Sequence, residues 1–295
     1  MTAVASIAAP AEGAPRKRGR FRLASPLWAA PAIIFLLAFL IVPLSANLIR
    51  SVTLGEAAQQ PFAYYQKLLF DAYYSGIFLN TFKVSLITTV CTLIVGYPVA
   101  YFMVRYAGRW NGLILFCLIA PLLTSIIMRT FGWRVLLARR GLLNVWLTDL
   151  GLIDRPIDIL NDPIIVYIGL IHVMVPFMVL SITAVLQGID VRLEESARVL
   201  GAGRWQAFRS VTLPLSLDGI ATGCTLVFVI TNGSFLTMLL LGGGKVQTLS
   251  LLIYQQFNLT QDVGFAATMG NVLLIAAMAC VALQGRFLKR KGIKE

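Results

Sequence analysis

The chain has 295 residues, of which 58% are hydrophobic and 13% are charged, and its formal net charge is +12. Soluble domains contain roughly 25% charged residues. The deficit excludes a water-soluble globule and indicates a protein whose solvent is largely lipid. The basic residues lie outside the apolar runs, as a membrane protein requires, so we expect no nucleic-acid partner. The four cysteines lie singly within apolar runs and predict neither a metal site nor a disulfide framework.

Six apolar segments are each long enough to cross a bilayer, which takes about 20 residues of helix. They run near residues 27–49, 79–104, 111–132, 163–187, 217–241 and 263–287. Because the runs are continuous and do not alternate, they predict helices and not barrel strands. We therefore expect an all-α membrane protein of six transmembrane helices. The first helix is expected to stay uncleaved, because its apolar run is too long for a signal peptide. Basic segments at 1–26 and 288–295 flank the helices.

The distribution of Lys and Arg predicts how the chain is oriented. With the N-terminus in the cytoplasm, more of these residues fall in inward-facing segments than in outward-facing ones, which places both termini in the cytoplasm. Four arginines run against this rule at the outer face: Arg129, Arg134, Arg139 and Arg140. The loop at 133–162 contains the stretch "GLLNVWLTDLGLID", an amphipathic helix too polar to span, which we expect at the outer interface.

One polar segment with a helical pattern, residues 188–216, separates the fourth and fifth apolar runs. Asp190 can cap a first helix, Gly201-Ala-Gly203 breaks it, and Pro214 is expected to end a second short helix. The apolar residues of the two helices fall on narrow faces: Leu193, Ala197 and Leu200, then Trp205 and Phe208. From the residues alone, the segment is either a solvated loop or a docking surface for a cytoplasmic partner.

The same segment resembles the EAA loop of ABC importer permeases. That pattern reads E-A-A, three residues, G, nine residues and I-x-L-P. This chain has Glu195-Ser196-Ala197, Gly201 and Val211-Thr212-Leu213-Pro214 at that spacing. Further segments between about residues 75 and 285 resemble the spermidine/putrescine branch: "PLLTSIIMRTFGW" (121–133), "GLLNVWLTDLGLID" (141–154), "VPFMVLSITAVLQGID" (175–190) and "LSLLIYQQF" (249–257). The chain departs from the family at Asp218, usually a proline, and at 231–244, which faces the pathway in the family and leaves the substrate open.

The resemblance implies a type I ABC importer permease fold over residues 75–287 and a non-catalytic, multi-pass subunit of the bacterial inner membrane. Its implied partners are a second permease subunit, two ATPase subunits and an extracytoplasmic binding protein. ATP and magnesium would bind to the ATPase, with no cofactor on this chain. The polar segment would form the coupling helix that seats on the ATPase, through Glu194, Glu195, Ala197, Gly201 and Pro214. Glu194 stands four residues before Arg198, the favourable order for a helical ion pair, and both glutamates can offer carboxylates to basic groups of a partner.

Polar residues within or beside the apolar runs are candidates for the transport pathway. They are Asn232, Ser234, Thr237, Tyr254, Asn258 and Asn271, and the same residue types also join helices within membranes. His172, the sole histidine, lies mid-span. We expect a neutral residue, hydrogen-bonded to a neighbouring helix or lining a polar cavity; a proton relay is the alternative.

The cargo is expected to be a polyamine such as spermidine or putrescine, on the branch resemblance. The same importer class offers alternatives: amino-acid-like amines, opines, phosphonates, ferric iron and thiamine. A secondary transporter is more distant, because no span holds a deep Asp or Glu and no inverted repeat is evident. The four outer arginines would dock an acidic lobe of the binding protein, or else pair with lipid headgroups or within the complex.

Overall fold

The computed structural model describes residues 30–290, and every regular element in that range is helical. The chain divides into two units, residues 1–46 and 47–295. The α-helices are α1 (Ala30–Thr53), α2 (Ala63–Phe70), α3 (Ala72–Arg105), α4 (Asn111–Leu123), α5 (Ile126–Leu137), α6 (Leu142–Asp149), α7 (Ile164–Gln187), α8 (Val191–Val199), α9 (Arg204–Ala207), α10 (Leu213–Leu215), α11 (Leu217–Asn232), α12 (Phe235–Leu241), α13 (Leu249–Asn258) and α14 (Val263–Arg290). The predicted basic segment 1–26 lies outside the described residues, as does the end of the tail at 288–295.

The described part of the first unit is the beginning of α1, which is apolar on all sides. Large side chains around its whole circumference are exposed, among them Ile34, Phe35, Leu36 and Phe39. A helix that is hydrophobic all round belongs in a membrane or inside a large protein. This segment is therefore built to be covered by lipid or by another apolar helix.

Within residues 30–290, four helices are long and apolar enough to cross a membrane, namely α1, α3, α7 and α14. Two further candidates are bent pairs, Gly108–Leu123 with Ile126–Asp149 and Arg204–Leu215 with Leu217–Asn232, so that counting each pair as one span gives six. The six predicted segments thus all have helical counterparts. The second begins earlier than expected, at Ala72, because Asp71 caps α3 by accepting a 2.8 Å hydrogen bond from the Tyr73 amide.

The prediction of one continuous helix over 111–132 is wrong. The chain bends by 100° between α4 and α5, where Thr124 is extended with φ −90° and ψ 146°. The break strands the last carbonyl groups of α4, which a helix cannot satisfy by itself. The Arg129 guanidinium donates hydrogen bonds to the carbonyls of Pro121 and Thr124 and so replaces the missing partners.

The predicted helix over 217–241 is also interrupted, at Gly233 and Ser234. Side chains beside the break donate hydrogen bonds to backbone carbonyls. Asn232 donates to Phe228 O at 2.8 Å, and Ser234 donates to Ile230 O at 2.8 Å. The break therefore puts polar side chains and the C-terminal end of α11 at one place within an otherwise apolar span.

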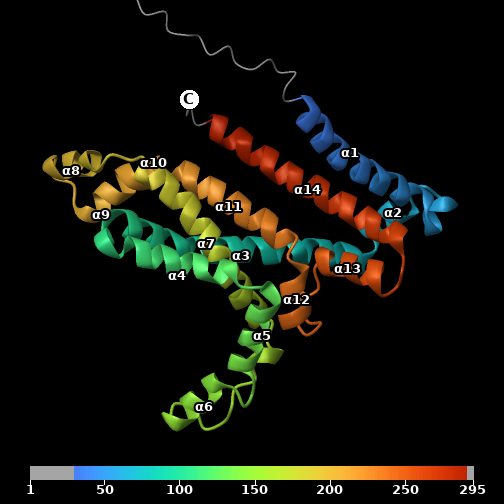
Figure 1. Ribbon diagram of the computed structural model, residues 1–295, viewed down its shortest axis with the longest axis horizontal. Helices are drawn as coiled ribbons and strands as arrows, with labels where there is room; N and C mark the ends of the chain where they lie inside the picture. The colour runs from blue at the N-terminus through green and yellow to red at the C-terminus, as the bar shows by residue number, and fades with distance from the viewer. Residues whose placement is uncertain (1–29, 291–295) are drawn as a thin grey trace, which may run out of the picture. The chain divides into compact units, whose positions relative to one another are not determined.

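The centre of the second unit is formed by α3, α7 and α11, which lie side by side, with α8 to α10 at one end and α13 at the other (Figure 1). Two glycines let α11 approach α7. A Cβ atom on Gly219 would lie 3.1 Å from the backbone of Ile182, and one on Gly223 would lie 2.7 Å from Sδ of Met178. Small residues at this four-residue spacing allow close packing of helices in membranes.

We predict that Gly219→Ala destabilises the protein by about 1–3 kcal/mol, the usual cost of forcing an extra carbon into a packed interface. Gly223→Ala should cost less, because its added carbon meets the flexible end of Met178 and not backbone. Thermal unfolding of the detergent-purified protein measures both losses. Gly112→Ala on α4 is the control, since a Cβ there meets nothing within 4 Å. Equal melting temperatures for the Gly219 and Gly112 variants would contradict the packing.

Candidate functional site

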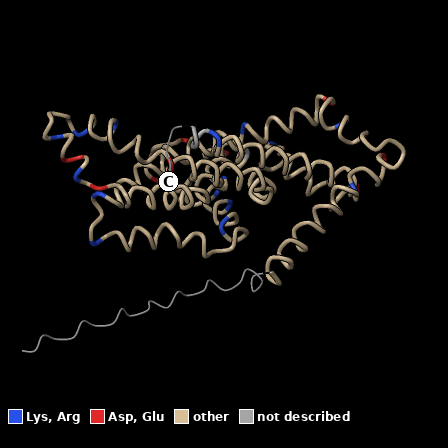
Figure 2. The backbone as a smooth tube through the Cα atoms, turned by 90° about the horizontal axis from the view of Figure 1, so that it is seen from above, with Lys and Arg blue, Asp and Glu red and all other residues tan. Residues whose placement is uncertain are grey.

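The polar segment, residues 188–216, lies at one end of the α3–α7–α11 group (Figure 1) and contains seven charged residues. Figure 2 shows charged residues gathered near the ends of the helices, while the long helices are uncharged over most of their length. Within this segment α8 begins after Asp190, whose carboxylate accepts a hydrogen bond from the Arg192 amide at 2.9 Å. The predicted N-cap is confirmed.

The glycine elbow after α8 is a defined turn. The amide of Ala202 bonds to Ala197 O at 3.0 Å, and the amide of Gly201 bonds to Arg198 O at 3.0 Å. This pair of bonds is the Schellman arrangement, which needs a left-handed residue just after the helix. Gly201 supplies it with φ +93°. The helix–elbow–helix prediction is confirmed.

The second part of the segment is helical and contains a wider turn. After α9 it becomes a π-helix, Phe208–Thr212, and continues as α10 to Leu215. The predicted end at Pro214 is confirmed to within one residue. The wider turn accommodates a proline ring that lacks an amide and would crowd the carbonyl four residues earlier. Trp205 and Phe208 share one face as predicted, with ring centroids 5.3 Å apart.

The segment exposes apolar side chains around the elbow. Val199 is 87% exposed, Leu200 88% and Trp205 72%. Glu195 and Gly201 are exposed beside them, while Ala197 is half-buried. Large apolar side chains exposed together, with charged residues around them, are typical of a protein-binding surface.

Glu194 does not belong to that exposed surface. Its side chain is 6% exposed, and Oε1 accepts a 3.0 Å hydrogen bond from Nε of Arg105. The expectation that Glu194 offers its carboxylate to a partner is therefore wrong, because the chain's own Arg105 occupies it. The sequence pattern did not single out Arg105, which stands at the end of an apolar run far from Glu194 in the chain.

Five of the six pathway candidates lie on α11, α12 and α13 or at the break between them. Asn232 is buried, and its Oδ1 has no hydrogen-bond partner among the described residues. Thr237 is buried on α12. Tyr254 stacks on Phe235 with ring centroids 5.0 Å apart, which joins α13 to the start of α12. Asn258, exposed at the end of α13, donates to Tyr254 O at 3.1 Å. Ser234 lies in the break itself.

The sixth candidate, Asn271, is part of a cluster that fastens α14 to α1 and α2. Its side chain accepts a 2.8 Å hydrogen bond from Asn47 and donates to Ser51 and Tyr65 at 3.2 and 3.3 Å. Polar groups shared between helices in this way stabilise helix pairs in membranes. The sequence could not distinguish this environment from that of Asn232, because both residues are asparagines within apolar runs.

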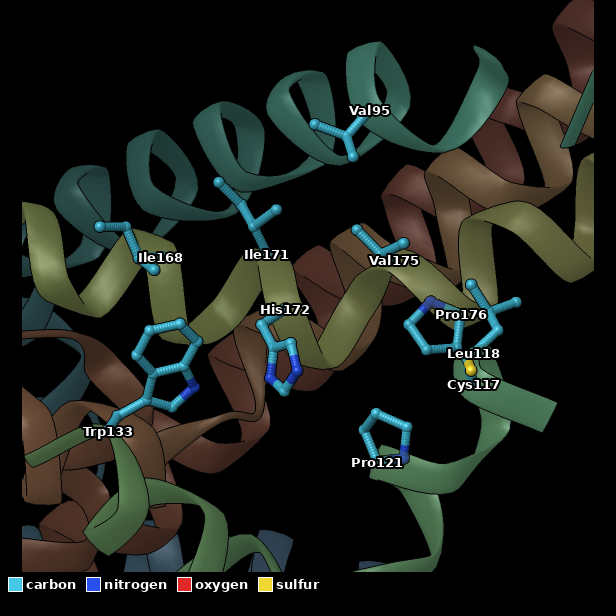
Figure 3. Close-up of a pocket in the computed structure, with 10 residues that line it drawn as sticks. All are labelled: Val95, Cys117, Leu118, Pro121, Trp133, Ile168, Ile171, His172, Val175 and Pro176. Atoms are coloured by element: carbon cyan, nitrogen blue, oxygen red, sulfur yellow. The ribbon is translucent and has the colours of Figure 1, made fainter. Parts of the chain in front are cut away.

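His172 lines a hollow of about 410 Å³ between α3, α4, α5 and α7 (Figure 3). Its ring meets Trp133 edge to face with centroids 5.5 Å apart, and Nδ1 has no hydrogen-bond partner among the described residues. The other lining residues are apolar: Val95, Cys117, Leu118, Pro121, Ile168, Ile171, Val175 and Pro176. The expectation of a polar cavity is wrong, and the helix-to-helix hydrogen bond is not seen at Nδ1.

The four outer arginines do not act alike. Arg129 bonds to backbone across the α4–α5 bend, which corrects its assignment to a docking surface. Arg134 and Arg139 line a hollow of about 370 Å³ together with Asp158 and residues of α12. Arg140 is exposed beside them. A basic surface is thus present at this place, but it has three arginines and not four.

Comparison with known proteins agrees with this arrangement. Residues 2–292 match the family described as "Binding-protein-dependent transport system inner membrane component". The spermidine/putrescine transport system permease protein PotB of Haemophilus influenzae is 36% identical over 226 residues, which cover 76% of this chain and 79% of that protein. PotB of Escherichia coli K12 is 36% identical over 211 residues, covering 72% and 76%.

A solved structure shares the fold. A chain of a bacterial alginate ABC transporter, solved in complex with an alginate pentasaccharide-bound periplasmic protein, superposes with a TM-score of 0.78. The match covers 91% of this chain and 94% of that one at 21% identity.

We predict that Gly201→Ala loosens the elbow, because a side chain at positive φ costs about 1–3 kcal/mol. Trypsin cleavage at the flanking Arg198 and Arg204, measured in detergent solution, should become roughly fivefold faster or more, as such a cost implies for local opening. Gly203→Ala is the matched control, since Gly203 has φ −65° and an added Cβ meets nothing within 4 Å. Equal cleavage rates in the two variants would show that the turn does not depend on a glycine.

Proposed function

Because the chain belongs to the family of binding-protein-dependent transport system inner membrane components and is therefore the permease subunit of an ABC importer, we propose that its cargo is a polyamine such as spermidine or putrescine. The observation that carries the proposal is the similarity to PotB permeases over about three quarters of the chain. The permease is a non-catalytic, multi-pass protein of the inner membrane. It works with an ATPase and a substrate-binding protein.

The interruption between α11 and α12 suits a cationic cargo. The C-terminal end of a helix carries partial negative charge, and broken helices in transporters bind cations with freed carbonyls. Here the end of α11 lies beside Asn232, whose buried Oδ1 is an unoccupied acceptor among the described residues. The stacked rings of Phe235 and Tyr254 add aromatic faces for a cation. These groups would bind the cation in place of a carboxylate, because no carboxylate lies deep in a span.

The assembly has a second permease subunit, two ATPase subunits and one binding protein, with both termini of this chain in the cytoplasm. The excess of Lys and Arg in the inward-facing segments supports this orientation. It puts residues 188–216 on the cytoplasmic side, facing the ATPase, which binds ATP and magnesium. The exposed apolar residues and Glu195 around the elbow are the surface that the ATPase covers.

At the outer face, Arg134, Arg139 and Arg140 meet an acidic lobe of the binding protein. Two of the three border a hollow that a protruding side chain of a partner can enter. Complementary charge of this kind accelerates association more than it increases affinity. The arginines are therefore expected to set how fast the loaded binding protein arrives.

The cargo is tested with the affinity-purified complex in liposomes, together with its binding protein. We expect ATP hydrolysis to be stimulated by putrescine or spermidine and not by an amino-acid-like amine, an opine, a phosphonate, ferric iron or thiamine. Stimulation by one of these others would replace the polyamine and leave the importer intact. A complex recovered without ATPase activity would contradict the assignment of the partner.

Glu195→Lys is predicted to uncouple ATP hydrolysis from transport. The exposed carboxylate would be exchanged for a like charge facing basic groups of the ATPase, and a lost charge-assisted hydrogen bond is worth about 1.5–3 kcal/mol. The number of cargo molecules carried per ATP should fall on the order of tenfold, since about 1.4 kcal/mol is a factor of ten. Asp149→Lys, the same charge change on exposed α6, is the control and should keep the wild-type ratio. A wild-type ratio for Glu195→Lys would refute the docking surface.

A further inference from the structure

A buried ion pair connects α8 to the end of α3. Nε of Arg105 lies 3.0 Å from Oε1 of Glu194, and the two side chains are 8% and 6% exposed. The pair between Lys67 and Glu56 is different, with side chains 36% and 60% exposed. Burying two charges is costly unless their geometry is good and their remaining hydrogen-bonding groups are satisfied. A pair that persists in such a place is expected to have a specific role.

The pair is part of a network that satisfies most of its polar groups. Oε1 of Glu194 also accepts from the Thr212 hydroxyl at 2.9 Å, and Oε2 lies 3.5 Å from the Tyr101 hydroxyl. Nη2 of Arg105 donates to Ile189 O at 3.2 Å. The contacts come from α3, from the turn after α7, from α8 and from the π-helical turn. Four parts of the chain thus meet at this ion pair.

This network attaches α8 to α3 and to the π-helical turn, and α8 also lies against α9. Glu194 is the only buried residue of α8, all nine of whose residues the structure describes. The helix is not held by an apolar face, since Leu193, Val199 and Leu200 are all exposed. A single carboxylate with directional bonds therefore determines how α8 sits against its neighbours.

A second hydrogen bond fastens α3 to the other side of the same segment. The Tyr97 hydroxyl lies 2.9 Å from Oγ of Ser216, just before α11, and both residues are buried. The last turns of α3 are thus bonded both to α8 and to the junction of α10 with α11. A displacement of α8 can pass to α3 directly through Arg105, without going through the glycine elbow.

We propose that Glu194 is a positioning residue that locks α8 to α3 through Arg105 and Thr212, so that α8 and the end of α3 move as one body when the ATPase closes. The proposal rests on the proposed docking of residues 188–216 onto the ATPase. It assigns to Glu194 a role opposite to that of its neighbour Glu195: the exposed carboxylate meets the partner, and the buried one transmits the movement inward.

The first test is a double-mutant cycle on the reconstituted complex with its ATPase and binding protein. Glu194→Gln leaves the Arg105 guanidinium buried without a counter-charge, and Arg105→Gln leaves the carboxylate in the same condition. Each is expected to reduce the cargo carried per ATP at least tenfold. The double variant has no unpaired buried charge and should recover much of that loss. Thr212→Val, which removes one hydrogen bond, should lower the ratio only a few-fold.

The ratio is measured per assembled complex, so a variant that merely folds less well loses complex without changing the ratio. Losses that simply add in the double variant would overturn the pairing. The outcome is also separable from that of the docking proposal. A low ratio with Glu195→Lys and a wild-type ratio with Glu194→Gln would keep the docking and overturn the lock. Wild-type ratios in both would remove the docking itself.

The second test measures the movement. Spin labels are placed on exposed positions of the two helices, Arg192 on α8 and Phe102 on α3, in a variant whose four cysteines are replaced by alanine. We expect one narrow distance distribution, unchanged between the nucleotide-free complex and the complex trapped with ATP and vanadate. Glu194→Gln should broaden it and shift it on trapping. A shift of the same size with the native glutamate would show that α8 and α3 move separately.

Discussion

Every backbone polar group within a membrane span must find a partner inside this protein, because the hydrocarbon of a membrane offers none. This constraint explains why all regular elements of residues 30–290 are helices, and it governs the places where helices stop. Where α4 bends into α5, an arginine side chain takes over the stranded carbonyls. Where α11 breaks before α12, the side chains of Asn232 and Ser234 donate hydrogen bonds to carbonyls in the last turns of α11. Each break in a span is accompanied by a nearby donor.

The break at Thr124 and the break at Gly233 have different roles. The bend at Thr124 uses Arg129 as a structural donor. The break at Gly233 instead leaves an acceptor without a partner among the described residues, Oδ1 of Asn232, inside the protein. An unsatisfied buried acceptor is costly. A passing cationic ligand that donates a hydrogen bond to it would remove that cost. The same backbone constraint thus yields a hydrogen-bonded bend at Thr124 and a candidate binding position at Gly233.

At one end of the central helices, α8 combines an exposed surface with a single buried carboxylate. Its sequence predicted the helix, the cap, the glycine elbow and the aromatic face, because these depend on residues close together in the chain. The burial and pairing of the Glu194 carboxylate depend on Arg105, which lies 89 residues earlier. A helical pattern places Glu194 beside Arg198 with equal ease, and only packing against α3 decides between the two partners.

The sequence by itself determined the fold class, the six apolar segments and the coupling-loop resemblance, because long apolar runs and close spacings act locally. Tertiary structure decided which polar residues serve the fold and which remain available. Asn271 joins helices, while Oδ1 of Asn232 has no partner in the part of the chain that the structure describes. Arg129 bridges a bend while Arg140 stays exposed. These pairs have identical side chains in similar stretches, so the difference lies entirely in neighbours that come from distant parts of the chain. Hydrogen bonds of this kind cannot be read from local pattern, because each depends on where another helix packs.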